Sequence, residues 1–197
     1  HILRARQQVN AQSDGGTLVP LAEMITQARS SQVVESLARI NELAQGGHTQ
    51  SAMEEAFYAL QFAPTYLPLH AFMGDLLAAD DQVQEAIEKY TAVAKSYSTR
   101  GEARRAVEYY RKIIEIAPHN LQARRYLVTQ LIATGQIVEA VKEQMSLAEV
   151  YYHQADLEMT RKAYAEALRL CQQYRLDRSW AVEILNRLAD IYMQSLD

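Results

Sequence analysis

Histidine and cysteine, the side chains that most often bind zinc together, are few in this sequence, with five and one copies. A zinc site on one helix needs two histidines four residues apart, and no two of the five have that spacing: His1, His48, His70, His119 and His153. We interpret these histidines as turn or groove residues. The single cysteine, Cys171, excludes an internal disulfide and a cysteine-only zinc site, and we expect it to be a small buried apolar residue.

Acidic residues occur in pairs, such as Glu54–Glu55 and Asp80–Asp81. A catalytic pair of carboxylates needs burial and two environments that separate the pKa values, and the sequence around these pairs indicates neither. They are typical of solvated helix surfaces and caps. The sequence also has no Gly-rich phosphate loop, no Gly-x-Ser-x-Gly turn and no metal-binding loop. We therefore expect no enzyme, with no catalytic residue, no metal and no cofactor.

The charge of the chain limits its partners. The net charge is −4 and the pI about 5.8, so attraction to nucleic acid or to an anionic membrane is not expected. No apolar run approaches the roughly 20 residues that span a bilayer. Between residues 100 and 125, however, the sequence contains seven cations and only three carboxylates. This stretch is either a solvated helix face with pairs such as Arg104–Glu108, or a docking site for an acidic peptide or, with less support, RNA.

The elements that would position these residues are helices. Hydrophobic residues make up 49% of the chain, which is enough for a core, and seven Gly and four Pro are few for an all-β fold. Apolar residues recur at helical spacing, with short breaks at Gly, Pro and Asp. Short linkers force neighbouring helices to run antiparallel. The predicted helices cover residues 17–30, 32–45, 49–63, 67–79, 83–99, 102–117, 121–134, 137–154, 157–173 and 177–195.

The beginning of the chain is interpreted separately. The chain starts at His1, and no leader-like segment follows. We therefore interpret the chain as a piece of a longer polypeptide. Residues 2–11 look helical and a Gly pair follows soon after, so 1–12 is predicted to be the end of a preceding helix or repeat. Residues 13–197 are predicted to form one continuous domain.

The sequence repeats itself at an offset of 54 residues. The offset aligns Leu67 with Leu121 and Glu85-Ala86 with Glu139-Ala140, and backwards it aligns Pro118 with Pro64. A register kept over three copies indicates a three-helix unit that buries its apolar face only by stacking on the next unit. The predicted blocks are 13–66, 67–120 and 121–174, followed by a terminal helix at 175–197.

One helix in each block carries a recognisable pattern. Ala106, Tyr110, Ile113 and Pro118 resemble the second helix of a tetratricopeptide repeat, in which a small residue is followed by an aromatic, an apolar residue and a proline. Parts of the same pattern return at Ala52, Ala59, Pro64, Tyr164 and Ala167. The resemblance implies an all-α, right-handed α-solenoid of antiparallel helix hairpins. The middle helices combine first-helix and second-helix marks, so the family's period of roughly 34 residues is replaced by overlapping units.

The resemblance also indicates where a partner would bind. In such repeats one face of the first helix looks into a concave groove, which here would carry Phe72 and Tyr126. Both are either peptide anchors or packing residues between hairpins. The groove side would also carry Asn41, Asp75, Lys95, Arg125 and Thr129. Lys95 and Arg125 suit an acidic group, whereas Asp75 opposes one, so the family's carboxylate clamp is not clearly present.

These observations together predict a non-catalytic scaffold that binds a peptide or helix of another protein in its groove, in a cytoplasmic chain. The compartment of a longer parent stays open. One alternative is self-assembly into a homo-oligomer through the last helix, with Trp180, Ile184, Leu188 and Ile191 as the contact. Another alternative is a regulatory or sensor domain of a larger protein.

Overall fold

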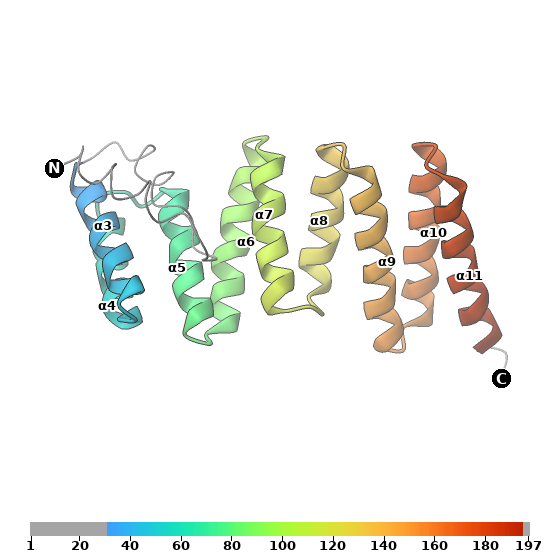
Figure 1. Cartoon of the computed structure of the whole chain (residues 1–197), viewed down its shortest axis with the longest axis horizontal. Coiled ribbons are helices and arrows are strands. Elements are labelled where there is room, and N and C mark those ends of the chain that lie inside the picture. The colour runs from blue at the N-terminus through green and yellow to red at the C-terminus, as the bar shows by residue number, and fades with distance from the viewer. Residues whose placement is uncertain (1–30, 195–197) are drawn as a thin grey trace. The chain divides into compact units, whose positions relative to one another are not determined.

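The structure is a computed structural model that describes residues 31–194, and every regular element in that range is an α-helix. The predicted segments at 1–12 and 17–30 lie outside the described residues. The helices are α3 (Ser31–Gln45), α4 (Thr49–Leu60), α5 (Leu67–Ala79), α6 (Val83–Thr99), α7 (Ala103–Ile116), α8 (Leu121–Ala133), α9 (Ile137–His153), α10 (Leu157–Gln173) and α11 (Arg178–Gln194) (Figure 1). The all-α prediction is therefore confirmed, and the helix bounds agree closely with those expected.

The largest difference in bounds is at the end of α4, which stops three residues earlier than predicted. After Leu60 the backbone tightens: the Gln61 N–H donates to Tyr58 O at 3.1 Å and the Phe62 N–H to Ala59 O at 3.1 Å. Such i to i+3 bonds are a common way for a helix to satisfy its last carbonyls. The apolar spacing continues through this turn, so the sequence pattern did not distinguish it from helix.

Six connections between helices share one backbone motif. In each, a residue with φ between 51° and 77° follows the helix, and the next N–H donates to the carbonyl five residues back. This is the left-handed C-terminal cap, in which glycine is favoured because it has no Cβ. Glycine occupies three of the six positions and other residues the rest: Gly47, Gly101, Gly135, Asp81, Ala155 and Arg175.

The chain divides into two compact units, with the boundary between Val93 and Ala94 inside α6. The described part of the first unit holds α3, α4, α5 and most of α6. Its core joins ten buried residues from α3, α4 and α5: Val33, Leu37, Ile40, Ala52, Ala56, Ala59, Leu69, Phe72, Met73 and Leu76. The three alanines on α4 have no exposed surface. Their small side chains allow the neighbouring helices to approach closely.

In the second unit, α7 to α11 follow one another as neighbouring helices. Aromatic residues fill the spaces between them, and Tyr110 and Tyr164 are both buried. Ala106, Tyr110 and Ile113, which carry the family pattern on α7, face this interior. The core of α9, α10 and α11 is built from Val141, Met145, Leu147, Ala148, Tyr151, Ala163, Tyr164, Ala167, Leu170, Cys171, Ile184 and Ile191.

The packing confirms one expectation about a single residue. Cys171 is buried in the α9–α11 core, as predicted, and burial raises the pKa of its thiol. No described helix combines the length and the apolar character needed to cross a bilayer. Within residues 31–194, no group of three or more His, Cys, Asp or Glu side chains is arranged to hold a metal ion.

Candidate functional site

The six residues predicted to contact a partner fall into two groups. Phe72 and Asp75, on α5, are buried, with 1% and 6% of their surface exposed. Phe72 belongs to the core of the first unit, so the packing alternative applies and it is not a surface anchor. Asp75 accepts a hydrogen bond from the Tyr90 hydroxyl at 2.7 Å, which satisfies a buried carboxylate. Neither side chain is placed to meet a partner, which corrects that part of the expectation.

The close contact between α5 and α6 explains how Asp75 is satisfied in the interior. A Cβ added to Gly74 would lie 2.7 Å from Tyr90 Cε1, so the tyrosine ring rests directly on the backbone of α5. This approach brings the Tyr90 hydroxyl to Asp75. The offset that places Phe72 opposite Tyr126 holds for the sequence, but the two aromatic residues differ in exposure.

The other four residues lie in the second unit, where α6 and α8 contribute them. Tyr126 is half-buried and stacks on Tyr110, with ring centroids 5.5 Å apart. Lys95 Nζ lies 5.7 Å from the centroid of the Tyr126 ring. Arg125 and Thr129 are exposed on α8, and the Thr129 hydroxyl donates to Arg125 O at 3.1 Å. We call Lys95, Arg125, Tyr126 and Thr129 the Tyr126 surface.

The two cations of the Tyr126 surface are not used in ion pairs among the described residues. Within the part of the chain that the structure describes, neither Lys95 nor Arg125 has a carboxylate within ion-pair distance. The Lys95 ammonium instead lies near the Tyr126 ring, a contact worth roughly 0.5–1 kcal/mol at an exposed site. Beneath it, burial raises the pKa of Tyr110 to about 12, with a further contribution from Tyr126. Tyr110 is therefore uncharged at neutral pH, and its buried ring is a rigid support for the ring of Tyr126.

Other cations of the 100–125 stretch are already paired. Arg111 forms an ion pair with Glu139, and Arg124 forms one with Glu143. The predicted i, i+4 pair of Arg104 is not among the ion pairs of the described residues, and Arg104 remains exposed. The stretch therefore contains both cations in ion pairs and exposed cations.

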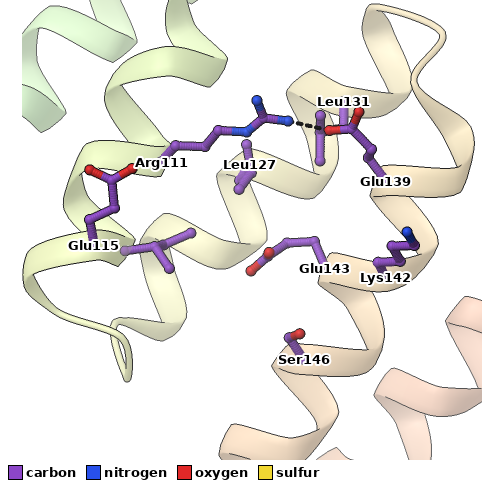
Figure 2. A pocket seen from close by; sticks show the side chains of 9 residues that line it. Arg111, Glu115, Leu127, Leu131, Glu139, Lys142, Glu143 and Ser146 are labelled. Carbon is purple, nitrogen blue, oxygen red and sulfur yellow. Dashed lines mark hydrogen bonds and ion pairs between the residues drawn. The ribbon is translucent and has the colours of Figure 1, made fainter. Parts of the chain in front are cut away.

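The structural pairs surround a pocket of about 290 Å³ between α7, α8 and α9. Figure 2 shows the Arg111 side chain extended across this pocket to Glu139, with Glu143 pointing into it from α9. Leu127 and Leu131 from α8 are at its base. The Arg111–Glu139 ion pair thus spans the mouth of the pocket.

Glu143 and Arg124 form a largely shielded ion pair, with side chains 17% and 12% exposed. Burial raises the pKa of Glu143 above its ordinary value, and the Arg124 guanidinium opposes that rise. Arg124 also donates from Nε to Pro118 O at 2.8 Å, which fixes its guanidinium beside the carboxylate. The pair joins α8 to α9 and is a structural contact, because both groups are largely shielded from solvent.

A larger pocket of about 710 Å³ lies in the first unit, between α4, α5 and α6. Phe57 on α4 is 55% exposed at this pocket, and Met53 and Leu77 are partly exposed. Its rim also carries four carboxylates and one ammonium group: Glu54, Asp80, Glu85, Glu88 and Lys89. We call this pocket the Phe57 groove.

The sequence interpretation missed this groove. It treated Glu54 and Asp80 as ordinary surface charges, and it did not consider Phe57. A signal was present, because the 54-residue offset places Phe57 opposite Arg111. An aromatic residue where the next copy has a cation indicates that the two copies use this position differently.

The predicted oligomer contact on α11 also needs correction. Ile184 and Ile191 are buried, and Trp180 and Leu188 pack partly against the same core. These four residues belong to the side of α11 that packs on the core of α9 and α10, although Trp180 and Leu188 remain partly exposed. The exposed apolar side chains of α11 lie on its other side, at Val182, Leu185, Tyr192 and Met193.

Comparison with known proteins agrees with the helical repeat. Residues 87–120 match the sequence model of the tetratricopeptide repeat. This segment begins within α6 and includes all of α7, where the sequence showed first-helix marks followed by the second-helix pattern. No curated protein sequence matches the chain.

Several solved structures have a similar arrangement of helices at low sequence identity. YrrB, described as a TPR protein with an unusual peptide-binding site, is 16% identical, with 88% of this chain and 92% of that chain covered and a TM-score of 0.38. MamA is 13% identical, with coverages of 80% and 96% and a TM-score of 0.40. TTC0263, a thermophilic TPR protein of Thermus thermophilus, is 15% identical, with coverages of 80% and 99% and a TM-score of 0.30.

The match to the family model agrees with the helical repeat and with the buried Ala106, Tyr110 and Ile113 of α7. The fold of this family is in general a scaffold for contacts between proteins. The resemblance of this all-α chain to the tetratricopeptide-repeat family is confirmed by the match of residues 87–120 to the family's sequence model.

Proposed function

We propose that the chain is a non-catalytic scaffold whose Tyr126 surface binds an acidic, partly apolar segment of another protein. The observation that carries this proposal is the placement of two exposed cations without carboxylate partners among the described residues, Lys95 and Arg125, beside the half-buried ring of Tyr126. An aromatic ring that stacks on a buried ring is a suitable anchor for an apolar side chain. The anchor ring is already held in place, so it loses little conformational entropy when a partner covers it.

The charges of this surface define the partner's chemistry. A segment with Asp or Glu beside its apolar anchor would complement Lys95 and Arg125, and Thr129 offers a hydroxyl beside them. Complementary charge increases the rate of encounter and excludes segments of the wrong sign. The net charge of −4 for the whole chain makes this cationic surface selective, because most of the remaining surface repels an acidic peptide.

A matched set of three peptides tests the proposal. The peptides share their Leu and Phe positions and carry Glu, Gln or Lys at every polar position, and binding is measured by fluorescence anisotropy. The Glu peptide is expected to bind at least tenfold more tightly than the Gln peptide. The double substitution Lys95→Glu/Arg125→Glu is expected to remove that preference, because it reverses both charges.

Controls separate binding from folding. Arg178→Glu reverses an exposed charge at the start of α11 and is expected to leave the Glu peptide's affinity unchanged. Tyr126→Phe is expected to bind as the wild type does, and Tyr126→Leu to bind more weakly, because only the ring is the anchor. Equal affinity of the wild type and the double variant for the Glu peptide, with both proteins folded by circular dichroism, would contradict the proposal.

A second candidate function is self-association through α11. Val182, Leu185 and Met193 are each more than half exposed and fall on one face of the helix. Exposed apolar side chains that form a contiguous patch are typical of an interface. Leu185→Glu is expected to convert a dimer into a monomer in size-exclusion chromatography with light scattering. A wild-type chain that is monomeric at high concentration would contradict this candidate.

A further inference from the structure

The two pockets described above occupy equivalent places in the repeat. The 54-residue offset aligns the residues at their bases, Met73 with Leu127 and Leu77 with Leu131. It also aligns Glu85 on α6 with Glu139 on α9. Each pocket lies over the first helix of a repeat block, α5 or α8, and is flanked by the helix before it and the helix after it. The comparison is therefore between two copies of one site.

The copies differ at one decisive position. In the second unit Arg111 extends across the pocket and pairs with Glu139 (Figure 2). In the first unit the residue at the place of Arg111 is Phe57, whose side chain cannot pair with Glu85. The first pocket consequently has no such ion pair across its mouth, and its volume is about 710 Å³ against about 290 Å³.

Three carboxylates of the Phe57 groove have no ion-pair partner among the described residues, whereas Asp80 accepts a hydrogen bond from the Gln82 side chain at 2.6 Å. Glu54, Glu85 and Glu88 have no ion pair in the part of the chain that the structure describes. Lys89 stands where the second copy has Glu143, and it is the one cation among the described residues of the rim. The rim therefore carries a net negative charge.

The apolar part of the pocket is of a size that suits side chains. Phe57, Met53 and Leu77 expose carbon surface at the mouth, above the buried Met73 and Leu76. Pockets of about 300–1,000 Å³ accept ligands of several side chains' volume. An apolar pocket with a carboxylate rim favours an apolar group flanked by cations, since such a group covers the carbon surface and neutralises the rim.

We propose that the Phe57 groove binds a basic, partly apolar segment of another protein, with an apolar side chain against Phe57 and Leu77 and Lys or Arg beside Glu85 and Glu88. This site is separate from the Tyr126 surface and has the opposite charge preference. The equivalent pocket of the second unit does not bind such a segment, because Arg111 spans its mouth and supplies the cation itself.

The Lys peptide of the matched set tests this inference directly. It is expected to bind the wild-type chain at least tenfold more tightly than the Gln peptide. Phe57→Arg places at the first pocket the residue that its copy has, so it is expected to pair with Glu85 and to reduce the affinity for the Lys peptide at least tenfold. Tyr58→Arg adds the same charge at a neighbouring exposed residue that does not line the groove, and it is expected to bind the Lys peptide nearly as the wild type does.

A second variant separates the apolar contact from the charge. Glu85→Gln/Glu88→Gln is expected to lower the affinity for the Lys peptide and to leave the Gln peptide's affinity unchanged. In the wild type, raising the salt concentration is expected to weaken the Lys peptide more than it weakens the Gln peptide. In the double variant the two peptides should respond to salt nearly alike.

The outcomes that overturn the inference are distinct from those that test the Tyr126 surface. Equal binding of the Lys peptide to the wild type and Phe57→Arg would overturn it, as would equal loss in Phe57→Arg and Tyr58→Arg. Conversion of a wild-type dimer into a monomer by Phe57→Arg would show a second copy of the chain in the groove, which also contradicts a basic partner. Lys95→Glu/Arg125→Glu should leave the Lys peptide's binding intact, so either proposal can fail alone.

Discussion

At the scale of single residues, the structure separates charges that hold the chain together from charges that are free for a partner. Arg124 and Glu143 are shielded and joined, whereas Arg125, the neighbour of Arg124 in sequence, is exposed. Adjacent residues on a helix point about 100° apart, so one of them can pack against α9 while the other is exposed. The composition of the 100–125 stretch could not assign these roles.

The Arg124–Glu143 pair gives a stability prediction. Arg124→Met leaves Glu143 shielded without its partner, which is expected to lower the free energy of unfolding at pH 7 by about 3 kcal/mol, the low end of the range for a buried pair because both side chains keep some exposure. Burial already raises the pKa of Glu143, and removal of the guanidinium raises that pKa further. The folded variant therefore takes up a proton more readily than the unfolded chain, and its deficit relative to the wild type should shrink as the pH falls toward 5.

Urea unfolding at pH 7 and pH 5 measures this effect. Adding Glu143→Gln to Arg124→Met is expected to recover part of the loss at pH 7, because no buried charge remains. Arg169→Met breaks the exposed pair with Glu166 and is expected to leave stability near that of the wild type. A deficit in Arg124→Met that is the same at both pH values would contradict a buried, unpartnered Glu143.

Tyr110 gives a second pH prediction. Its pKa in the folded chain is about 12, against an ordinary value of 10.0, because burial disfavours the phenolate and Tyr126 adds to that effect. The unfolded chain therefore releases this proton first, and the stability that the neutral hydroxyl provides is present below pH 10 and is lost as the pH rises toward 12. Tyr110→Phe has no proton to release, so its stability should fall less steeply over that interval. Parallel curves for the two proteins in alkaline urea unfolding would contradict this assignment.

At the scale of elements, the helices could be predicted well from sequence because their apolar spacing and their breaks agree. Leu67–Ala79 and Val83–Thr99 have the predicted bounds, since Asp80-Asp81 and Gly101 end the pattern sharply after them. The end of α4 could not be predicted, because Phe62 and Ala63 continue the apolar spacing through a turn. The local sequence pattern thus predicts the positions of helices more reliably than it predicts their last residues.

The candidate surface was harder to predict because helix periodicity does not tell which neighbour covers a residue. Phe72 and Tyr126 are equivalent under the repeat, yet Phe72 is buried among α3, α4 and α5 whereas Tyr126 is only half-buried. The same holds for Ile184 on α11. Its spacing correctly predicted an apolar helix face, but that face packs on the core and was wrongly expected to contact a second copy of the chain. Sequence predicted an apolar face, and only the packing shows whether a helix already covers it.

The contact of α5 with α6 gives a prediction at this scale. Gly74→Ala adds a Cβ that would lie 2.7 Å from Tyr90 Cε1, so the ring must shift and its hydrogen bond to Asp75 is disturbed. We expect the free energy of unfolding to fall by about 2 kcal/mol, within the range for an overpacked core. Gly46→Ala is the matched control, because its nearest contact is the exposed His48 side chain, and it should change stability little. Equal effects of the two substitutions in urea unfolding would contradict the close approach.

At the scale of the whole molecule, the 54-residue repeat explains how one architecture carries two kinds of surface. The helices and their capping turns are kept from copy to copy, while individual positions exchange roles, as Phe57 and Arg111 do. A repeat scaffold tolerates such exchanges because each helix contacts mainly its neighbours. The account therefore predicts two docking surfaces, one in each compact unit, with opposite charge preferences.

The most direct test of this account is an amide ¹H–¹⁵N correlation spectrum of the labelled chain, recorded during separate titrations with the Glu and Lys peptides. The account predicts two disjoint sets of shifted signals. The Glu peptide should shift amides around Lys95, Arg125 and Tyr126, and the Lys peptide amides around Phe57, Leu77 and Glu85. Shifts in one common set for both peptides, or shifts that avoid these residues, would contradict the claim of two separate docking surfaces.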